Sequence, residues 1–136
     1  MTIQRAKLLF LVAGIYGLAV VVPLFFLENK IGELDPPAIS HPEFYYGFAW
    51  VTVAWQIVYL MMSRYPVRFR PMLIPAVISK AGFALTAYYL CGVGRLAARN
   101  LILPSTDLVL VALFVWTYVS LGRLRATAGM SSCAVY

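Results

Sequence analysis

The segment Leu8–Leu27 reads LLFLVAGIYGLAVVVPLFFL and contains no charged residue in 20 positions. The hydrocarbon core of a bilayer is ~30 Å thick, and a helix needs about 20 apolar residues to cross it. A secretory signal has a shorter apolar core and ends at small residues, whereas this segment runs into Glu28-Asn29-Lys30. The segment therefore predicts a retained transmembrane helix.

Three further apolar segments follow along the chain. Lipid offers no partners to unpaired backbone groups, so each segment is expected to be a helix. The sequence predicts an all-α fold, a four-helix transmembrane bundle, with spans at residues 8–27, 44–62, 72–94 and 105–122. These spans form one membrane domain over residues 1–126, and the small, polar residues 127–136 are expected to be a flexible cytoplasmic tail.

The composition agrees with lipid as the main solvent of the chain. Hydrophobic residues make up 62% and charged residues 12%, whereas a soluble domain has roughly 45–50% and ~25%. A soluble protein of 136 residues could not bury that much apolar surface. This excludes a nucleic-acid partner and a disulfide scaffold. Cys91 and Cys133 have neither CxxC spacing nor clustered histidines, so we expect no metal and no cofactor.

The distribution of basic residues predicts the orientation in the membrane. Cytoplasmic loops carry an excess of Lys and Arg. The side with both termini carries Arg5, Lys7, Arg64, Arg68, Arg70, Arg123 and Arg125, and the other side carries Lys30, Arg95 and Arg99. All five acidic residues also fall on that other side. We therefore expect an N-in, C-in, multi-pass protein of the plasma (inner) membrane.

One polar residue in each span lies at a similar distance from the cytoplasmic face. At 1.5 Å per residue, Lys80 and Tyr16 lie ~12 Å deep, Gln56 ~10 Å and Thr117 ~9 Å. Small and polar stripes on the second and third spans lead us to expect that Gln56 contacts Lys80. Two interpretations of Lys80 stay open: it is structural, with its stem letting the amine reach the cytoplasmic headgroups or a pairing partner, or it serves a ligand or a proton.

Two other polar groups lie at the ends of the spans. His41, Glu43 and Asp107 are expected at the outer rim, and the motif Pro104-Ser105-Thr106-Asp107 is typical of a helix N-cap. A cluster of basic residues is expected on the cytoplasmic side, made of Arg64, Arg68 and Arg70. Its position agrees with the positive-inside rule, and the alternative is a binding site for lipid headgroups.

Three stretches of the chain form a recognisable pattern: His41-Pro-Glu-Phe-Tyr-Tyr-Gly-Phe48, Ala54-Trp55-Gln56 and Pro66-Val-Arg-Phe-Arg-Pro71. Together with Lys80, this pattern resembles a group of small bacterial four-span membrane proteins. The resemblance covers residues 41–82. It implies an inner-membrane location without an assigned activity. It also implies that a carboxylate usually found beside the third-span lysine is replaced by Ser79 here, which argues against an ion pair at Lys80.

These observations favour a non-enzymatic membrane component, either an accessory subunit of a larger membrane complex or a small homo-oligomer. The alternative is a binder or carrier of an apolar small molecule or lipid, which would use Lys80 and Gln56. An enzyme is the least favoured class, and no residue is assigned a catalytic role. The candidate ligand-binding residues are Lys80, Gln56, Tyr16, Thr117, His41, Glu43 and Asp107.

Overall fold

The computed structural model describes residues 2–34, 36 and 38–133, with side chains through residue 123. This part of the chain is helical and contains no strand. Four helical stretches are long and apolar enough to cross a membrane, namely Ile3–Val21, Pro42–Arg64, Arg70–Gly92 and Ala98–Arg123. The prediction of an all-α protein with four spanning helices is confirmed. The chain divides into two compact units, Lys7–Tyr65 and a second made of Met1–Ala6 with Pro66–Tyr136.

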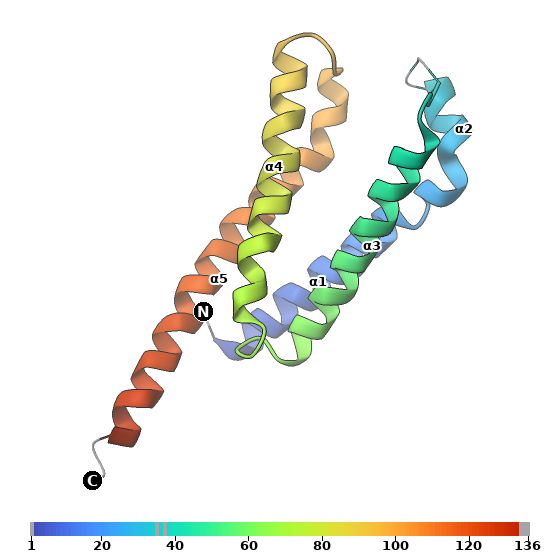
Figure 1. Cartoon of the computed structure of the whole chain (residues 1–136). Coiled ribbons are helices and arrows are strands. Elements are labelled where there is room, and N and C mark those ends of the chain that lie inside the picture. The colour runs from blue at the N-terminus through green and yellow to red at the C-terminus, as the bar shows by residue number, and fades with distance from the viewer. Residues whose placement is uncertain (1, 35, 37, 134–136) are drawn as a thin grey trace. The chain divides into compact units, whose positions relative to one another are not determined.

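The first unit contains α1 (Ile3–Val21, from Lys7 on), α2 (Leu24–Leu34) and α3 (Pro42–Arg64). The predicted first span, residues 8–27, is wrong at its end, because the chain turns at Val22–Pro23 and a separate helix begins (Figure 1). Proline has no N–H to donate to the preceding turn and its ring crowds the carbonyl four residues before it. Pro23 therefore ends α1 although its neighbours are apolar.

Two glycines bring α1 close to α3. A Cβ atom on Gly14 would lie 2.9 Å from Leu60 Cδ2 and 3.2 Å from the Gln56 carbonyl oxygen. A Cβ atom on Gly17 would collide with the side-chain amide of Gln56. Lipid is as apolar as the side chains, so the hydrophobic effect does not bring membrane helices together. They associate instead through close packing of this kind, in which small residues let the backbones approach.

Tyrosines fix α2 against the start of α3. The Tyr45 hydroxyl donates to the Leu24 carbonyl at 2.7 Å, and the Tyr46 hydroxyl donates to Glu28 Oε2 at 2.7 Å. The ring of Phe25 meets that of Trp50 edge-on, with 4.9 Å between centroids. The short helix α2 is thus tied to α3 by both hydrogen bonds and aromatic contacts.

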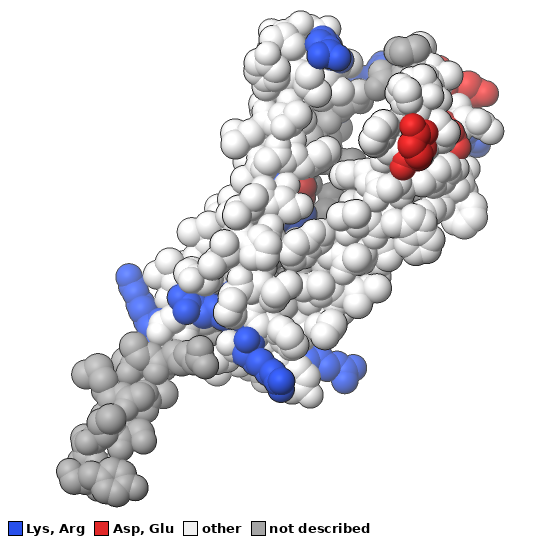
Figure 2. Space-filling view, in the orientation of Figure 1, with Lys and Arg blue, Asp and Glu red and all other residues white. Residues whose placement is uncertain are grey.

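The second unit is a helical hairpin, the α4–α5 hairpin. It begins with η1 (Arg70–Met72), continues as α4 (Leu73–Gly92), and returns through η2 (Ala98–Leu101) into α5 (Ile102–Cys133). These helices pack against each other along the hairpin, as Figure 1 shows. Figure 2 shows basic side chains near both ends of this unit.

A glycine closes the C-terminal end of α4. Gly94 has a φ of 74°, which an L side chain rarely adopts. Its N–H bonds to the Cys91 carbonyl at 3.0 Å, and the Arg95 N–H bonds to the Leu90 carbonyl at 2.8 Å. These two bonds form a Schellman motif, which satisfies carbonyls that the end of the helix would otherwise leave unpaired.

The fourth spanning helix begins earlier than predicted. It starts at Ile102 rather than at residue 105, with Pro104 buried in its first turn. Proline is tolerated there because the first amides of a helix lack intrahelical partners. Ser105 and Thr106 do not form an N-cap: their hydroxyls donate to the Leu101 and Leu103 carbonyls at 2.6 and 2.7 Å.

The end of the chain was expected to be a tail from residue 127. Helix α5 extends to Cys133 and so includes most of that segment. Residues 134–136 and the side chains of Arg125 and Cys133 lie outside the described part of the chain.

Candidate functional site: an ion pair inside the α4–α5 hairpin

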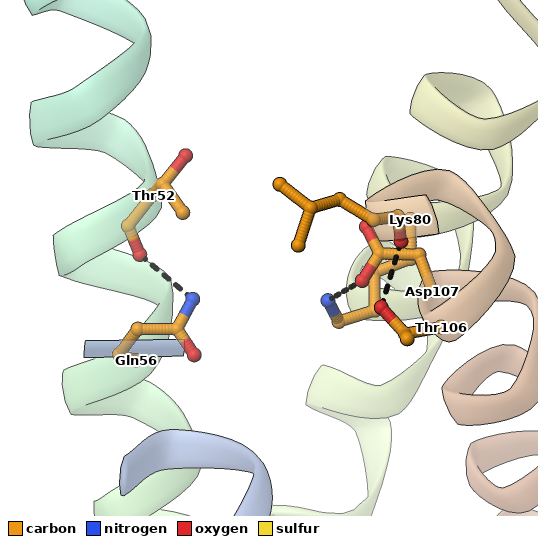
Figure 3. Close-up of polar contacts among 6 residues, drawn as sticks. Thr52, Gln56, Lys80, Thr106 and Asp107 are labelled. Carbon is orange, nitrogen blue, oxygen red and sulfur yellow. Dashed lines mark hydrogen bonds and ion pairs between the residues drawn. The ribbon is translucent and has the colours of Figure 1, made fainter. Parts of the chain in front are cut away.

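Lys80 and Asp107 form an ion pair between the two spanning helices of the hairpin. The Lys80 Nζ atom lies 2.6 Å from Asp107 Oδ1. The two side chains are 14% and 19% exposed. Figure 3 shows them pointing toward each other from α4 and α5. The pair is the charged centre of an otherwise apolar segment of the hairpin.

Contacts near both ends of α4 define its register against α5. Arg70 Nε donates to the Tyr118 carbonyl at 2.8 Å, and the Tyr88 hydroxyl lies 2.9 Å from Ser105 Oγ. Between these points, the Lys80 amine meets the Asp107 carboxylate at 2.6 Å. The flexible four-carbon stem of lysine lets the amine reach across to the neighbouring helix.

This geometry corrects one expectation about Lys80. The resemblance argued against an ion pair, but the structure places the carboxylate of Asp107 at hydrogen-bonding distance. The partner carboxylate comes from the neighbouring helix α5 and not from position 79 beside the lysine. The headgroup and ligand interpretations of the amine stay predictions.

The pair reduces the free-energy penalty of placing charge in lipid. An ionised side chain at the centre of a transmembrane helix is unfavourable by roughly 2.5–3.5 kcal/mol on insertion scales. Lys80 and Asp107 neutralise each other at a distance that is short even for a charge-assisted hydrogen bond. Removing one partner takes this neutralisation away from the other charge.

A second polar contact lies beside the pair, nearer the loop. Ser105 Oγ, two residues before Asp107, lies 2.9 Å from the Tyr88 hydroxyl. Because the Ser105 proton is donated to the Leu101 carbonyl, Tyr88 is the donor in this contact. Thr106 Oγ1 donates to the Leu103 carbonyl (Figure 3). The Tyr88–Ser105 contact thus joins α4 to α5 a second time, nearer the loop than the ion pair.

Gln56 occupies a separate polar position in the first unit. Its side chain is buried, at 4% exposure, and Nε2 donates to the Thr52 carbonyl at 3.1 Å (Figure 3). Gly17 provides the space for the amide. The expected contact with Lys80 would join the two units and stays a prediction. Tyr16, on α1, is 39% exposed.

Thr117 does not share a site with the ion pair. It follows Asp107 by ten positions on α5, which is ~15 Å along the helix axis. Its hydroxyl is buried and donates to the Leu113 carbonyl at 2.7 Å. The expectation that Thr117 and Lys80 share one polar layer is therefore wrong, because the Lys80 amine lies at Asp107.

His41 and Glu43 lie together at the start of α3. His41 Nδ1 is 3.4 Å from Glu43 Oε1, with side-chain exposures of 69% and 65%. An exposed pair of this kind contributes ~0–1 kcal/mol, and only while the imidazole is protonated. Glu43 in the first helical turn also interacts favourably with the helix dipole. No group of three or more metal-ligating residues occurs among the described residues.

The three arginines expected at lipid headgroups differ in their surroundings. Arg64 and Arg68 are exposed. Arg70 is half-buried, bonds to the Tyr118 carbonyl, and places its guanidinium carbon 3.9 Å from the centroid of the Tyr118 ring. Arg70 therefore packs against α5 within the protein.

Several of these contacts lay outside the sequence-based expectations but had a signal in the sequence. The pair Ala13–Gly17 has the small-xxx-small spacing of packed membrane helices. Lys80 and Asp107 are the only charged residues within the third and fourth predicted spans, 72–94 and 105–122. Opposite charges inside consecutive antiparallel spans are candidates for pairing.

Comparison of the chain with protein families, curated proteins and solved structures finds no match.

Proposed function

We propose that this chain is a non-enzymatic, multi-pass component of the bacterial inner membrane, acting as an accessory subunit of a larger membrane complex or as a small homo-oligomer. The ion pair between Lys80 and Asp107 supports this proposal most directly. This pair connects α4 to α5 through two charges that lie within the spanning helices. The resemblance over residues 41–82 supports the bacterial inner membrane.

Other polar groups within the spans are also satisfied inside the protein. Thr117 bonds to a carbonyl of its own helix, and so does the Gln56 amide. Among the described residues, no buried side-chain nitrogen or oxygen lacks a hydrogen-bond partner. A scaffold whose polar groups are satisfied internally leaves its apolar outer faces for lipid and for neighbouring helices.

The test is purification of the full chain from its native membrane in a mild detergent, followed by mass spectrometry of everything retained. A protein partner at constant stoichiometry, or a cross-linked homo-oligomer of one size, is the expected result. Crosslinking in intact membranes before solubilisation distinguishes a native partner from detergent-induced association. A monomer that retains a single small molecule at one equivalent contradicts the proposal.

The second candidate is a binder or carrier of an apolar molecule with a polar headgroup. The observation that favours it is that the Lys80 and Asp107 side chains are partly exposed, at 14% and 19%. An intramembrane charge is a functional candidate in its own right. A small molecule retained by the native chain and lost from the double variant Lys80→Met/Asp107→Leu would establish this candidate over the first.

A further inference from the structure

At the end of the hairpin opposite its loop, one arginine is held rigidly by three contacts with α5. Arg70 Nε donates to the Tyr118 carbonyl at 2.8 Å, and the guanidinium lies over the Tyr118 ring at 3.9 Å. A Cβ atom on Gly122 would lie 2.6 Å from Arg70 Nη2. The glycine therefore makes room for the guanidinium, and the position of this cation is set before any ligand arrives.

The hydrogen-bonding capacity of this guanidinium is only partly used. A guanidinium has five N–H donors, of which Nε carries one. Among the described residues, the Nη groups of Arg70 donate to no protein acceptor. The stacked ring of Tyr118 offers its π face to the cation, but it supplies no hydrogen-bond acceptor in that direction. The two Nη groups are thus available to an external acceptor.

The charge of this region is not balanced within its own unit. Asp107 is the only acidic residue between Pro66 and the C-terminus, and it is paired with Lys80. It also precedes Tyr118 by eleven positions, or ~16 Å of helix. Arg68 lies two residues before Arg70, and Arg123 follows Gly122 directly, so further positive charge lies at the same end.

We propose that Arg70, with Arg68 and Arg123, binds the phosphate of an anionic phospholipid headgroup at the foot of the α4–α5 hairpin. Two parallel N–H groups of a guanidinium match two phosphate oxygens, and a rigid arginine loses little side-chain entropy when they bind. The exposed apolar side chains of Val115 and Val119 lie on the same part of α5 and are available to an acyl chain.

This proposal goes beyond the proposed function, because it holds for an accessory subunit and for a carrier alike. It also differs from a general attraction of basic loops to lipid. Such an attraction gives about 1 kcal/mol for each Lys or Arg near an anionic surface, independent of its exact geometry. A built site instead depends on Arg70 more than on another arginine of the same unit.

The experiment uses the full chain in dodecyl maltoside with three additives: phosphatidylglycerol, phosphatidylcholine, and inorganic phosphate at equal phosphate concentration. Native mass spectrometry counts retained lipid, and a thermal-shift assay reports stabilisation. We expect phosphatidylglycerol to be retained and to raise the melting temperature, with little effect of phosphatidylcholine. Equal effects of the two lipids overturn the proposal. Equal stabilisation by inorganic phosphate overturns its lipid part and identifies a free-phosphate site.

Variants distinguish lipid binding at Arg70 from a general attraction between basic residues and anionic lipid. Arg70→Gln is expected to weaken retention of phosphatidylglycerol about tenfold, which corresponds to ~1.4 kcal/mol. The matched control is Arg95→Gln, which removes the same charge at the loop end of the same unit and should change retention less than about twofold. Equal losses in the two variants overturn the proposal.

Arg70→Gln also removes a contact between η1 and α5, so two further variants separate lipid binding from folding. The double variant Arg68→Gln/Arg123→Gln leaves all three contacts of Arg70 in place and should still weaken retention. Gly122→Ala keeps every charge but displaces the guanidinium, and it should weaken retention as well. Unchanged retention in both of these variants overturns the proposal.

Discussion

Breaking the Lys80–Asp107 ion pair should destabilise the protein strongly, and removing both charges should restore most of the loss. The perturbation is a double-mutant cycle made of Lys80→Met, Asp107→Leu and the double variant. Methionine keeps the length of the lysine stem, and leucine fills the space of the carboxylate with apolar atoms. Each single variant leaves one charge in the hairpin without its partner.

The distance and burial of the ion pair determine the expected loss of unfolding free energy. The partners are 2.6 Å apart and less than one-fifth exposed, so solvent screens them little. On insertion scales, placing a lone charge at the centre of a spanning helix has an unfavourable free energy of roughly 2.5–3.5 kcal/mol. Breaking a buried ion pair lowers the free energy of unfolding by ~3–5 kcal/mol. We expect each single variant to lose about 3 kcal/mol of unfolding free energy. The double variant should lie within about 1 kcal/mol of the native chain, because an apolar replacement of a buried pair is often neutral.

The assay is reversible unfolding in mixed micelles with increasing mole fraction of sodium dodecyl sulfate, followed by circular dichroism. Lys30→Met is the matched control, since Lys30 is exposed on α2, and it should change the free energy by less than about 0.5 kcal/mol. Single variants that resemble this control would show that the pair contributes nothing. A double variant as unstable as the sum of the two single variants would refute the coupling between Lys80 and Asp107.

Three other predictions follow from the packing and the charge pattern. Gly17→Ala should destabilise the protein by ~1–3 kcal/mol because its methyl group meets the Gln56 amide, whereas Gly82→Ala, where a Cβ atom meets nothing, should be neutral or stabilising in the same unfolding assay. Tyr46→Phe should cost ~1 kcal/mol by removing the hydrogen bond to Glu28 and should speed proteolysis of α2, while unchanged proteolysis would show that α2 does not depend on that bond. Reporter fusions after Arg125 and within residues 30–40 should report opposite sides of the membrane, with the C-terminus cytoplasmic, and an external C-terminus would contradict the four-span topology.

The amino-acid sequence by itself determines that this chain is an all-α membrane protein with four spanning helices. Long uncharged segments can satisfy their backbone groups in lipid only as helices, so hydropathy and length are sufficient. The centres of the spans follow from the same argument. Their ends do not, because Pro23 breaks an apolar run and Pro104 is accommodated inside a first turn.

The partners of the polar side chains are decided by the tertiary structure. Counting residues along a span gives the depth of a side chain in the membrane. A contact between two side chains also depends on the register of the two helices and on the direction in which each side chain points. Counting along the spans assigned Asp107 to the outer rim and Lys80 to a contact with Gln56. The packing of α4 against α5 instead brings the Asp107 carboxylate to 2.6 Å from the Lys80 amine. Close backbone approach at Gly17 likewise depends on which face of α1 meets α3, and the hydropathy of α1 contains no information about that face.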